Sequence, residues 1–480
     1  MEHQIASFIN HFAREVKENN AAIFAGAGLS AAAGFVDWKT LLKPIAEELR
    51  LNIGKEDNLV SVAQYHYNEK GQNRHRINQL LVEEFSRDAT LTENHRILAR
   101  LPISTFWTTN YDKLIEKAIE NSHKVADVKY TVKQLANTKP KRDAIVYKMH
   151  GDVEHPSDAI LTKDDYEKYH IKFDPYISAL GGDLVSKTFL FLGFSFTDPN
   201  IDYVLSRIRA TYTDHQREHY CIMRSVSRAE CENDADYEYK VRKQELFIGD
   251  LKRFNITTLL VAEYSRITDM LRLIESIYKL KTVFISGSAH EYGTIPKDKA
   301  EGFIHGLSKI LISRDYKVVS GFGLGVGSAV INGALEEIYC HGRKTTDEQL
   351  ILRPFPQNQT GTTPLISLRD EYRKDMIPLA GIALFLFGNK IDGGNVVLAN
   401  GVRREFEIAV DNGLRVVPVG ATGYMAEELW KVVSADLDKY YPGCSKEFKD
   451  NFAEIGDSTL EPEALLDSVI KLLDKIIRRS

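Results

Sequence analysis

The chain has 480 residues and a mass of 54.4 kDa, too long for one ordinary domain core. Hydrophobic residues make up 43% and charged residues 27%, which is typical of a folded globular protein and excludes disordered and fibrous classes. With 62 basic and 67 acidic side chains the net charge is -5, so we expect no nucleic-acid binding, and no apolar stretch suggests a membrane helix.

The first part of the chain alternates short apolar runs with amphipathic stretches. The predicted strands are Ala21–Ala25, Thr105–Thr109, Ile145–Met149, Thr188–Gly193, Tyr220–Met223 and Thr257–Val261. Runs that are apolar at nearly every position are typical of buried parallel strands. The predicted helices are Trp38–Leu49, Tyr111–Ile119, Ile201–Tyr212 and Ile267–Lys279. Repeated alternation of strand and helix predicts a doubly wound parallel sheet.

A second series of strands and helices begins after Lys281, where we place a domain boundary. The predicted strands are Thr282–Ser286, Lys317–Ser320, Ile351–Pro354, Gly381–Phe387 and Arg415–Val419. The predicted helices are Lys299–Ile312, Gly327–Tyr339, Arg369–Met376, Arg403–Val410 and Pro462–Arg478. The predicted fold class is therefore α/β, with two Rossmann-like, doubly wound parallel-sheet domains at 1–281 and 282–480.

Small and polar residues follow four of the strands in the first domain. The run Ala25-Gly26-Ala27-Gly28-Leu29-Ser30 is a loop whose glycines let the backbone approach a phosphate. Thr108–Asp112, Met149–Asp152 and Gly193–Phe196 each stand where a strand ends. Ligands of doubly wound sheets bind at the carboxyl ends of the strands, so the four elements together predict one nucleotide site.

The order of these elements, G-A-G-x-S, T-x-N-x-D, H-G and G-x-S, resembles that of the sirtuin superfamily, whose members cleave the nicotinamide–ribose bond of NAD+. The resemblance implies that Asn110 contacts the nicotinamide ribose and that His150 is a general base, which makes them the catalytic pair. It also implies a set of NAD+-binding residues, namely Ala25, Gly26, Gly28, Ser30, Asp112, Gly193 and Ser195. A neutral imidazole suits the single proton transfer that such a cleavage needs.

Two departures from the protein deacylases of this superfamily favour hydrolysis of NAD+ over deacylation. The deacylases carry a zinc module with two C-x-x-C pairs, whereas Cys221, Cys231, Cys340 and Cys444 are scattered, so we expect no metal. The deacylase motif G-I-P-D-F-R stands here as Gly34-Phe35-Val36-Asp37-Trp38-Lys39, without the arginine. Scattered thiols and the absence of an apolar signal core in Met1–Asn10 predict a cytoplasmic protein.

The second domain has glycine-rich loops of its own. The run Ser320–Ser328 has glycine at four alternate positions between a strand and a helix, and Phe284–Ser288 leads into another loop. Both are typical of nucleotide binding. Arg373 and Lys390 can pair with phosphates and Glu405 can accept from ribose hydroxyls, although each alone is typical of a solvated surface charge.

This half resembles the SLOG family, Rossmann-like nucleotide binders related to cytokinin-activating phosphoribohydrolases. Their catalytic motif P-G-G-x-G-T-x-x-E is absent, and Asp392-Gly393-Gly394-Asn395 is only a faint echo of it, which favours a binding module without catalysis. Together the two halves resemble the two-domain effectors of Thoeris anti-phage defence. That resemblance implies a homotetramer whose NAD+ cleavage is switched on by a cyclic ADP-ribose isomer from a partner TIR-domain protein. The signal-binding residues that it implies are Gly287, Ser288, Leu324, Gly325, Val326, Arg373, Lys390, Gly401 and Glu405.

Three other functions stay open at the level of the sequence. The first is an NAD-dependent protein deacylase, which the missing zinc pairs disfavour. The second is a nucleotide-sensing scaffold without catalysis, which the presence of both Asn110 and His150 disfavours. The third is a second domain that itself hydrolyses nucleotide monophosphates.

Overall fold

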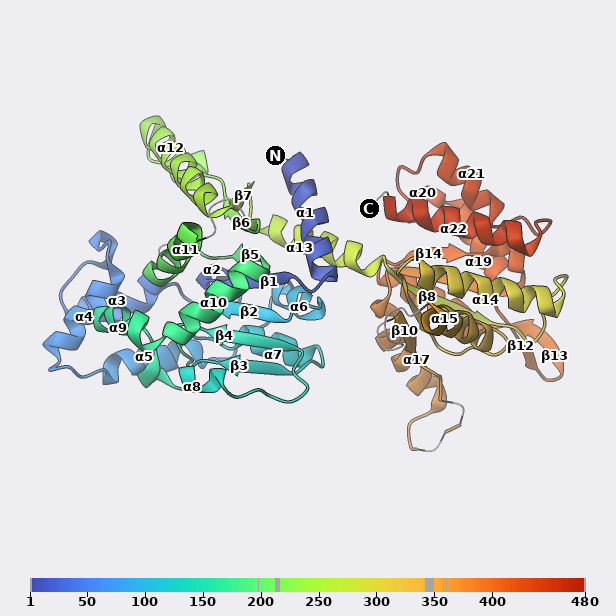
Figure 1. Cartoon of the computed structure of the whole chain (residues 1–480), viewed down its shortest axis with the longest axis horizontal. Coiled ribbons are helices and arrows are strands. Elements are labelled where there is room, and N and C mark those ends of the chain that lie inside the picture. Colours follow the sequence, from blue (N-terminus) through green and yellow to red (C-terminus); the bar gives the residue numbers. More distant parts are fainter. Residues whose placement is uncertain are drawn as a thin grey trace. The chain divides into compact units, whose positions relative to one another are not determined.

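The computed structural model describes residues 2–196, 198–211, 216–341, 349–356, 358–359 and 361–478. The chain divides into two compact units, Met1–Glu275 and Ser276–Ser480 (Figure 1). The division falls inside helix α13 (Ser265–Lys279), which ends just before the boundary that we placed at Lys281. Among the described residues, no helix combines the length and apolar character that crossing a membrane would require.

The first unit is built on a sheet of seven parallel strands in the order β3-β4-β2-β1-β5-β6-β7. The strands are β1 (Ala21–Ala25), β2 (Thr105–Thr108), β3 (Ala126–Lys129), β4 (Ala144–Lys148), β5 (Thr188–Leu192), β6 (His219–Arg224) and β7 (Ile256–Val261). The six predicted strands are present, and β3 is an additional edge strand. Because β1 lies between β2 and β5, the strand order reverses there, and this switch point is where doubly wound sheets bind ligands.

Twelve α-helices precede α13 in the described part of the first unit. They are α1 (Glu2–Lys17), α2 (Ala27–Ala31), α3 (Trp38–Glu48), α4 (Leu59–Glu69), α5 (His75–Phe85), α6 (Glu93–Arg100), α7 (Leu114–Asn121), α8 (Val132–Leu135), α9 (Lys163–Lys172), α10 (Asp174–Ser186), α11 (Pro199–Thr211) and α12 (Asp234–Leu251). The helix predicted from Tyr111 begins only at Leu114, whose amide donates to Asp112 Oδ1 at 2.9 Å. Residues 110–113 therefore form a turn after β2. Tyr212, the predicted end of α11, lies outside the described residues.

The second unit has five parallel strands in the order β10-β9-β8-β11-β14. They are β8 (Thr282–Ser288), β9 (Lys317–Ser320), β10 (Leu350–Leu352), β11 (Ile382–Phe387) and β14 (Arg415–Pro418). The prediction of two α/β units with parallel sheets is thus confirmed. The Asp392–Asn395 run joins a hairpin of β12 (Asn389–Asp392) and β13 (Asn395–Leu398). Gly393 and Gly394 have φ values of 57° and 84°, as a tight two-residue hairpin turn requires.

The helices of the second unit enclose one continuous hydrophobic core around β11, whose six residues are all buried. They are α14 (Lys297–Ser313), α15 (Gly327–Cys340), α17 (Leu365–Met376), α18 (Asn400–Asp411), α19 (Tyr424–Ala435), α20 (Leu437–Tyr440), α21 (Lys446–Glu454) and α22 (Pro462–Arg478). The apolar face of α22, with Leu465, Val469 and Leu473, is buried against α14 and α21. The last helix therefore caps the second unit.

Candidate functional site

A cavity of about 680 Å³ lies at the switch point of the first sheet. Seven of the residues predicted for the NAD+ site line it, namely Gly28, Ser30, Asn110, Asp112, His150, Gly193 and Ser195. Ala25 and Gly26 do not line it, and Ala25 is fully buried in β1. The four loops that the sequence singled out therefore meet at one cavity.

The glycines of this site let two loops touch. A Cβ on Gly26 would lie 2.4 Å from the carbonyl oxygen of Gly193, and Gly193 itself has a φ of 63°. The amide of Gly28 donates to the Gly193 carbonyl at 2.9 Å. These glycines thus serve the packing of the loop after β1 against the loop after β5. The Gly28 amide is already engaged, so it is not one of the groups available to a phosphate.

Hydrogen bonds fix the orientation of Asn110. Its Nδ2 donates to the carbonyl of Gly26 and to Ser30 Oγ, each at 3.0 Å. Ser30 Oγ in turn donates to Asp112 Oδ2 at 2.7 Å. An amide nitrogen has two protons, and both are used by these bonds. The carbonyl oxygen of Asn110 is therefore the group that this side chain can offer to a hydroxyl in the cavity.

His150 follows β4 and is paired with a carboxylate that the sequence reading missed. Its Nε2 lies 2.9 Å from Asp198 Oδ2, and the side chains are 3% and 9% exposed. Neither Nδ1 nor Nε2 of His150 has the geometry of a hydrogen bond to the described part of the chain, so the contact of Nε2 with Asp198 is an ion pair when the imidazole is protonated. The ring of Tyr166 stands edge-on to the imidazole, with centroids 5.5 Å apart.

Asp198 is held in its charged form. Burial alone would raise its pKa, but the charge of the protonated His150 ring and hydrogen bonds from the amides of Asn200 and Ile201 outweigh burial and lower the pKa. A buried carboxylate next to an imidazole orients the ring and stabilises the imidazolium that forms when the ring takes a proton. Asp198 stands five residues after Gly193, just beyond the predicted loop Gly193–Phe196. A carboxylate at this distance from a predicted site loop is the sequence signal from which Asp198 could have been predicted.

Much of the remaining cavity wall comes from segments outside the strand-end loops for which site residues were predicted. It comprises Phe35, Asp37, Trp38 and Lys39 around the start of α3, residues 57–60 at the start of α4, and Phe85 of α5. Lys39 occupies the position at which the deacylase motif has arginine, and it lines the cavity. These residues come from helices that fold over the sheet, so their position depends on tertiary packing and could not be read from local spacing.

Among the residues that the structure describes, no three His, Cys, Asp or Glu side chains are grouped to hold a metal ion. Cys221, Cys231, Cys340 and Cys444 are all free thiols.

A second cavity, of about 1060 Å³, lies at the strand ends of the second unit. Of the residues predicted for the signal, Gly287, Ser288, Leu324, Arg373, Lys390, Gly401 and Glu405 line it. Gly325 and Val326 do not. The side chain of Val326 is buried, and the Gly325 carbonyl accepts a bond from Tyr292 Oη at 2.9 Å. A Cβ on Gly323 would lie 1.9 Å from the Gly287 carbonyl, so the glycine-rich run packs the loop after β9 on the end of β8.

The second cavity contains a buried ion pair. Glu405 Oε1 accepts from Arg373 Nε at 3.0 Å, and its Oε2 accepts from Ser286 Oγ at 2.6 Å. Burial raises the pKa of Glu405 in spite of the Arg373 charge. The guanidinium also lies over the Phe355 ring, 4.8 Å from its centroid. A Cβ on Gly401 would lie 2.8 Å from Arg373 Nη2, so glycine at this position leaves room for the guanidinium.

Comparisons with known proteins find matches to both units of the chain. A SIR2-like domain family matches residues 104–244, and the Sir2- and TIR-associating SLOG family matches residues 266–476. "NAD(+) hydrolase ThsA" of Bacillus cereus strain MSX-D12 is 58% identical, over 97% of this chain and 97% of that protein. The protein of the same name from Acinetobacter baumannii strain 532279 is 48% identical, over 98% of this chain and all of that protein.

A more distant relative matches only part of the chain. "Defense-associated sirtuin 2" of Bacillus subtilis is 27% identical over 249 residues, which is 50% of this chain and 24% of that protein. The matches to the relatives from Bacillus cereus and Acinetobacter baumannii instead include both units, over 97% and 98% of this chain. Taken with the two family matches, this identity shows that the chain belongs to the family of two-domain, sirtuin-like and SLOG proteins named NAD(+) hydrolase ThsA.

Proposed function

We propose that the chain hydrolyses NAD+ to nicotinamide and ADP-ribose in the cavity of the first unit, within the domain that we assign to 1–281. The observation that carries this proposal is the convergence of two oriented groups on one cavity, the Asn110 amide and the His150 imidazole paired with Asp198. The names of the similar proteins support the same reaction.

The proposed chemistry matches what these groups can do. Cleavage of the glycosidic bond builds positive charge on the ribose and releases neutral nicotinamide, so the enzyme must position a water and accept one proton. The Asn110 carbonyl oxygen orients a ribose hydroxyl or the water, and His150 accepts the proton. Asp198, 2.9 Å from Nε2, then stabilises the imidazolium. Gly28, Ser30, Asp112, Gly193 and Ser195 form the surrounding wall that contacts NAD+, and Ala25 and Gly26 support it from behind.

Product analysis tests the cleavage reaction. The purified full-length protein is incubated with NAD+ and with cyclic ADP-ribose isomers, and the products are separated by chromatography. We expect nicotinamide and ADP-ribose from the wild type and neither from His150→Ala or Asn110→Ala. Release of nicotinamide by His150→Ala at the wild-type rate would refute the assignment of the base.

The second cavity is proposed to bind the activating signal, a cyclic ADP-ribose isomer, within 282–480. Arg373 and Lys390 supply positive charge for its phosphates, and Glu405 with Ser286 can accept or donate to ribose hydroxyls. The description of the matching family as TIR-associating supports a TIR-domain protein as the source of this signal. A ligand shifts the off–on equilibrium only through its different affinity for the two states.

The biological role that we propose is depletion of cytoplasmic NAD+ by a homotetramer during phage infection. Unregulated loss of NAD+ would kill the cell, which explains why a catalytic unit is joined to a sensing unit. Dependence of NAD+ cleavage on a cyclic ADP-ribose isomer is the direct test, and equal rates with and without every isomer would refute the regulatory part of the proposal.

A further inference from the structure

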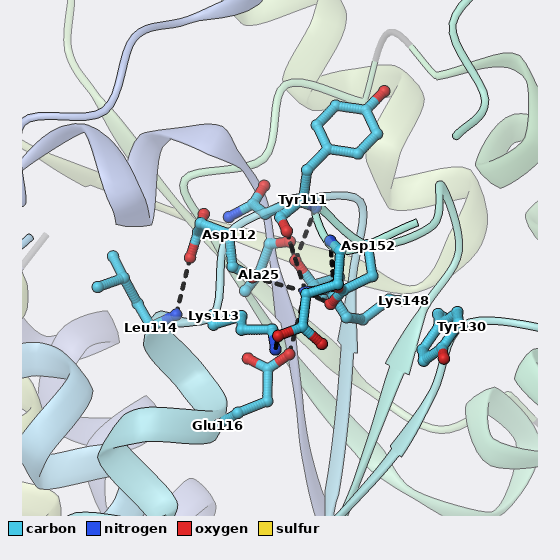
Figure 2. A network of polar contacts seen from close by, with 12 residues as sticks. Ala25, Tyr111, Asp112, Lys113, Leu114, Glu116, Tyr130, Lys148 and Asp152 are labelled. Carbon is cyan, nitrogen blue, oxygen red and sulfur yellow. Dashed lines mark hydrogen bonds and ion pairs between the residues drawn. The ribbon is translucent and has the colours of Figure 1, made fainter. Parts of the chain in front are cut away.

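The first unit contains a fully buried ammonium group close to the candidate active site. Lys148 is the last residue of β4, and its side chain is 0% exposed. Its Nζ donates to the carbonyl oxygens of Tyr111 at 3.1 Å and Asp112 at 2.6 Å. It also contacts the carboxylates of Asp152 at 2.5 Å and Glu116 at 3.0 Å (Figure 2). The Lys148 ammonium group thus contacts four oxygen atoms.

Three of these oxygens belong to the turns that carry the proposed catalytic side chains. Tyr111 and Asp112 directly follow Asn110, and Asp152 follows His150 by two residues. The ammonium therefore lies between the turn after β2 and the turn after β4 and bonds to both (Figure 2).

The ammonium remains charged in this position. Burial alone would lower the pKa of Lys148, but the charges of Glu116 and Asp152 outweigh burial and raise the pKa. Buried ion clusters are often no more stable than apolar side chains of similar volume, so stability alone does not explain a lysine here. What it provides is geometry, because a shift of about 1 Å in a catalytic group can cost about 10²-fold in rate.

We propose that Lys148 is a positioning residue that fixes the turn carrying Asn110 against the turn carrying His150. This inference rests on the proposed function, since it assumes that these two side chains are the catalytic pair. The bonds from Nζ to the Tyr111 and Asp112 carbonyls set the backbone from which Asn110 extends. The contact with Asp152 sets the backbone that follows His150.

Two variants separate positioning from charge balance. Lys148→Met removes the ammonium but leaves two buried carboxylates without a counter-charge, so its stability falls. The triple variant Lys148→Met/Glu116→Leu/Asp152→Asn also removes those charges and is the one that we expect to fold well. Lys129→Met is the matched control, because Lys129 is also a buried lysine at a strand end, paired with Asp127 at 2.7 Å.

The expected result is a loss of turnover that does not follow stability. With NAD+ and the cyclic ADP-ribose isomers, kcat of the triple variant falls about 10²-fold while its KM changes less than about threefold. Hydrogen–deuterium exchange becomes faster in peptides covering 109–114, at a melting temperature close to that of the wild type. Lys129→Met lowers the melting temperature but keeps kcat and the exchange of 109–114 close to wild-type values.

Other outcomes overturn the inference. Wild-type kcat in the triple variant would show that Lys148 only balances charge, and an equal loss of kcat in Lys129→Met would show a general effect of destabilisation. If the wild type itself released no nicotinamide, the proposed function would fail instead. The exchange measurement would then still decide whether Lys148 holds the turn after β2.

Discussion

The cavities of the two units lie at the strand ends of two parallel sheets, yet their polar groups are arranged for different tasks. In the first cavity, buried partners orient His150 and Asn110, and His150 Nδ1 has no protein partner in the described part of the chain. In the second, Arg373 and Glu405 bond to each other, and the phosphoribohydrolase motif is absent. Catalysis needs polar atoms that are oriented but unused, whereas recognition needs only matched charge and shape.

The largest effect that separates the two cavities is expected from the catalytic pair. We expect His150→Ala and Asn110→Ala each to lower kcat at least 10²-fold, because they remove the proton acceptor and the group that orients the reacting hydroxyl. Steady-state nicotinamide release measures this. Both variants should still bind a cyclic ADP-ribose isomer, and loss of that binding would show that the effect is not confined to the first cavity.

Arg373→Ala should have the opposite effect, loss of activation by the signal with basal cleavage of NAD+ retained. It removes a cation from the second cavity, so we expect activation by the cyclic ADP-ribose isomer to be lost while basal cleavage of NAD+ persists. Because the change leaves Glu405 buried without its partner, the free energy of unfolding should also fall by about 3 kcal/mol. The double variant Arg373→Ala/Glu405→Gln relieves that cost. Arg314→Ala, which breaks an ion pair with Asp474 at the protein surface, is the control.

The pairing of Asp198 with His150 predicts a pH effect on stability. The folded-state pKa of Asp198 is lowered, so its charged form contributes stability that is fully present above the unfolded pKa of about 4 and is lost as the pH falls through the folded pKa. The difference in free energy of unfolding between wild type and Asp198→Asn, measured by urea denaturation, should therefore shrink below about pH 4. A difference that stayed constant down to pH 2 would contradict the pairing.

The smallest effect is expected from Lys39, an exposed cation on the wall of the first cavity. Because it can attract the NAD+ phosphates through solvent, Lys39→Met should raise KM for NAD+ a few-fold, leave kcat unchanged and lose its effect at high salt. A decrease in kcat with constant KM would instead place Lys39 at the reacting bond.

The architecture was largely predictable because parallel strands buried on both faces are written as short apolar runs. All eleven predicted strands are present, but β3 and the hairpin strands β12 and β13 were missed. The sequence of β3, Ala126–Lys129, alternates apolar and charged residues and so lacks the continuous apolar run of a buried strand. Residues 111–113 of the turn after β2 were predicted as the start of a helix because Tyr111, Leu114 and Ile115 fit a helical face. The helix begins only at Leu114, whose amide donates to the side chain of Asp112. The spacing of apolar residues does not reveal such a bond.

The residues of the candidate sites also fall into those that the sequence predicted and those that it did not. Gly28, Asn110 and His150 were predicted from loops that follow recognisable strands and from the resemblance to sirtuins, and all three line the first cavity. Asp198 and Lys148 were not, because their roles depend on contacts between segments that are distant in the sequence. Lys148 in particular reads as the polar end of an apolar strand, and only the fold brings it to Tyr111 and Asp112.

The most direct test of a division of labour between the two cavities compares three proteins in one assay. Nicotinamide release and binding of a cyclic ADP-ribose isomer are measured for the wild type, His150→Ala and Arg373→Ala/Glu405→Gln. We expect the wild type to bind and to be activated, His150→Ala to bind without cleaving NAD+, and the double variant to keep basal cleavage without binding. Cleavage by His150→Ala at the wild-type rate, or full activation of the double variant, would contradict the assignment.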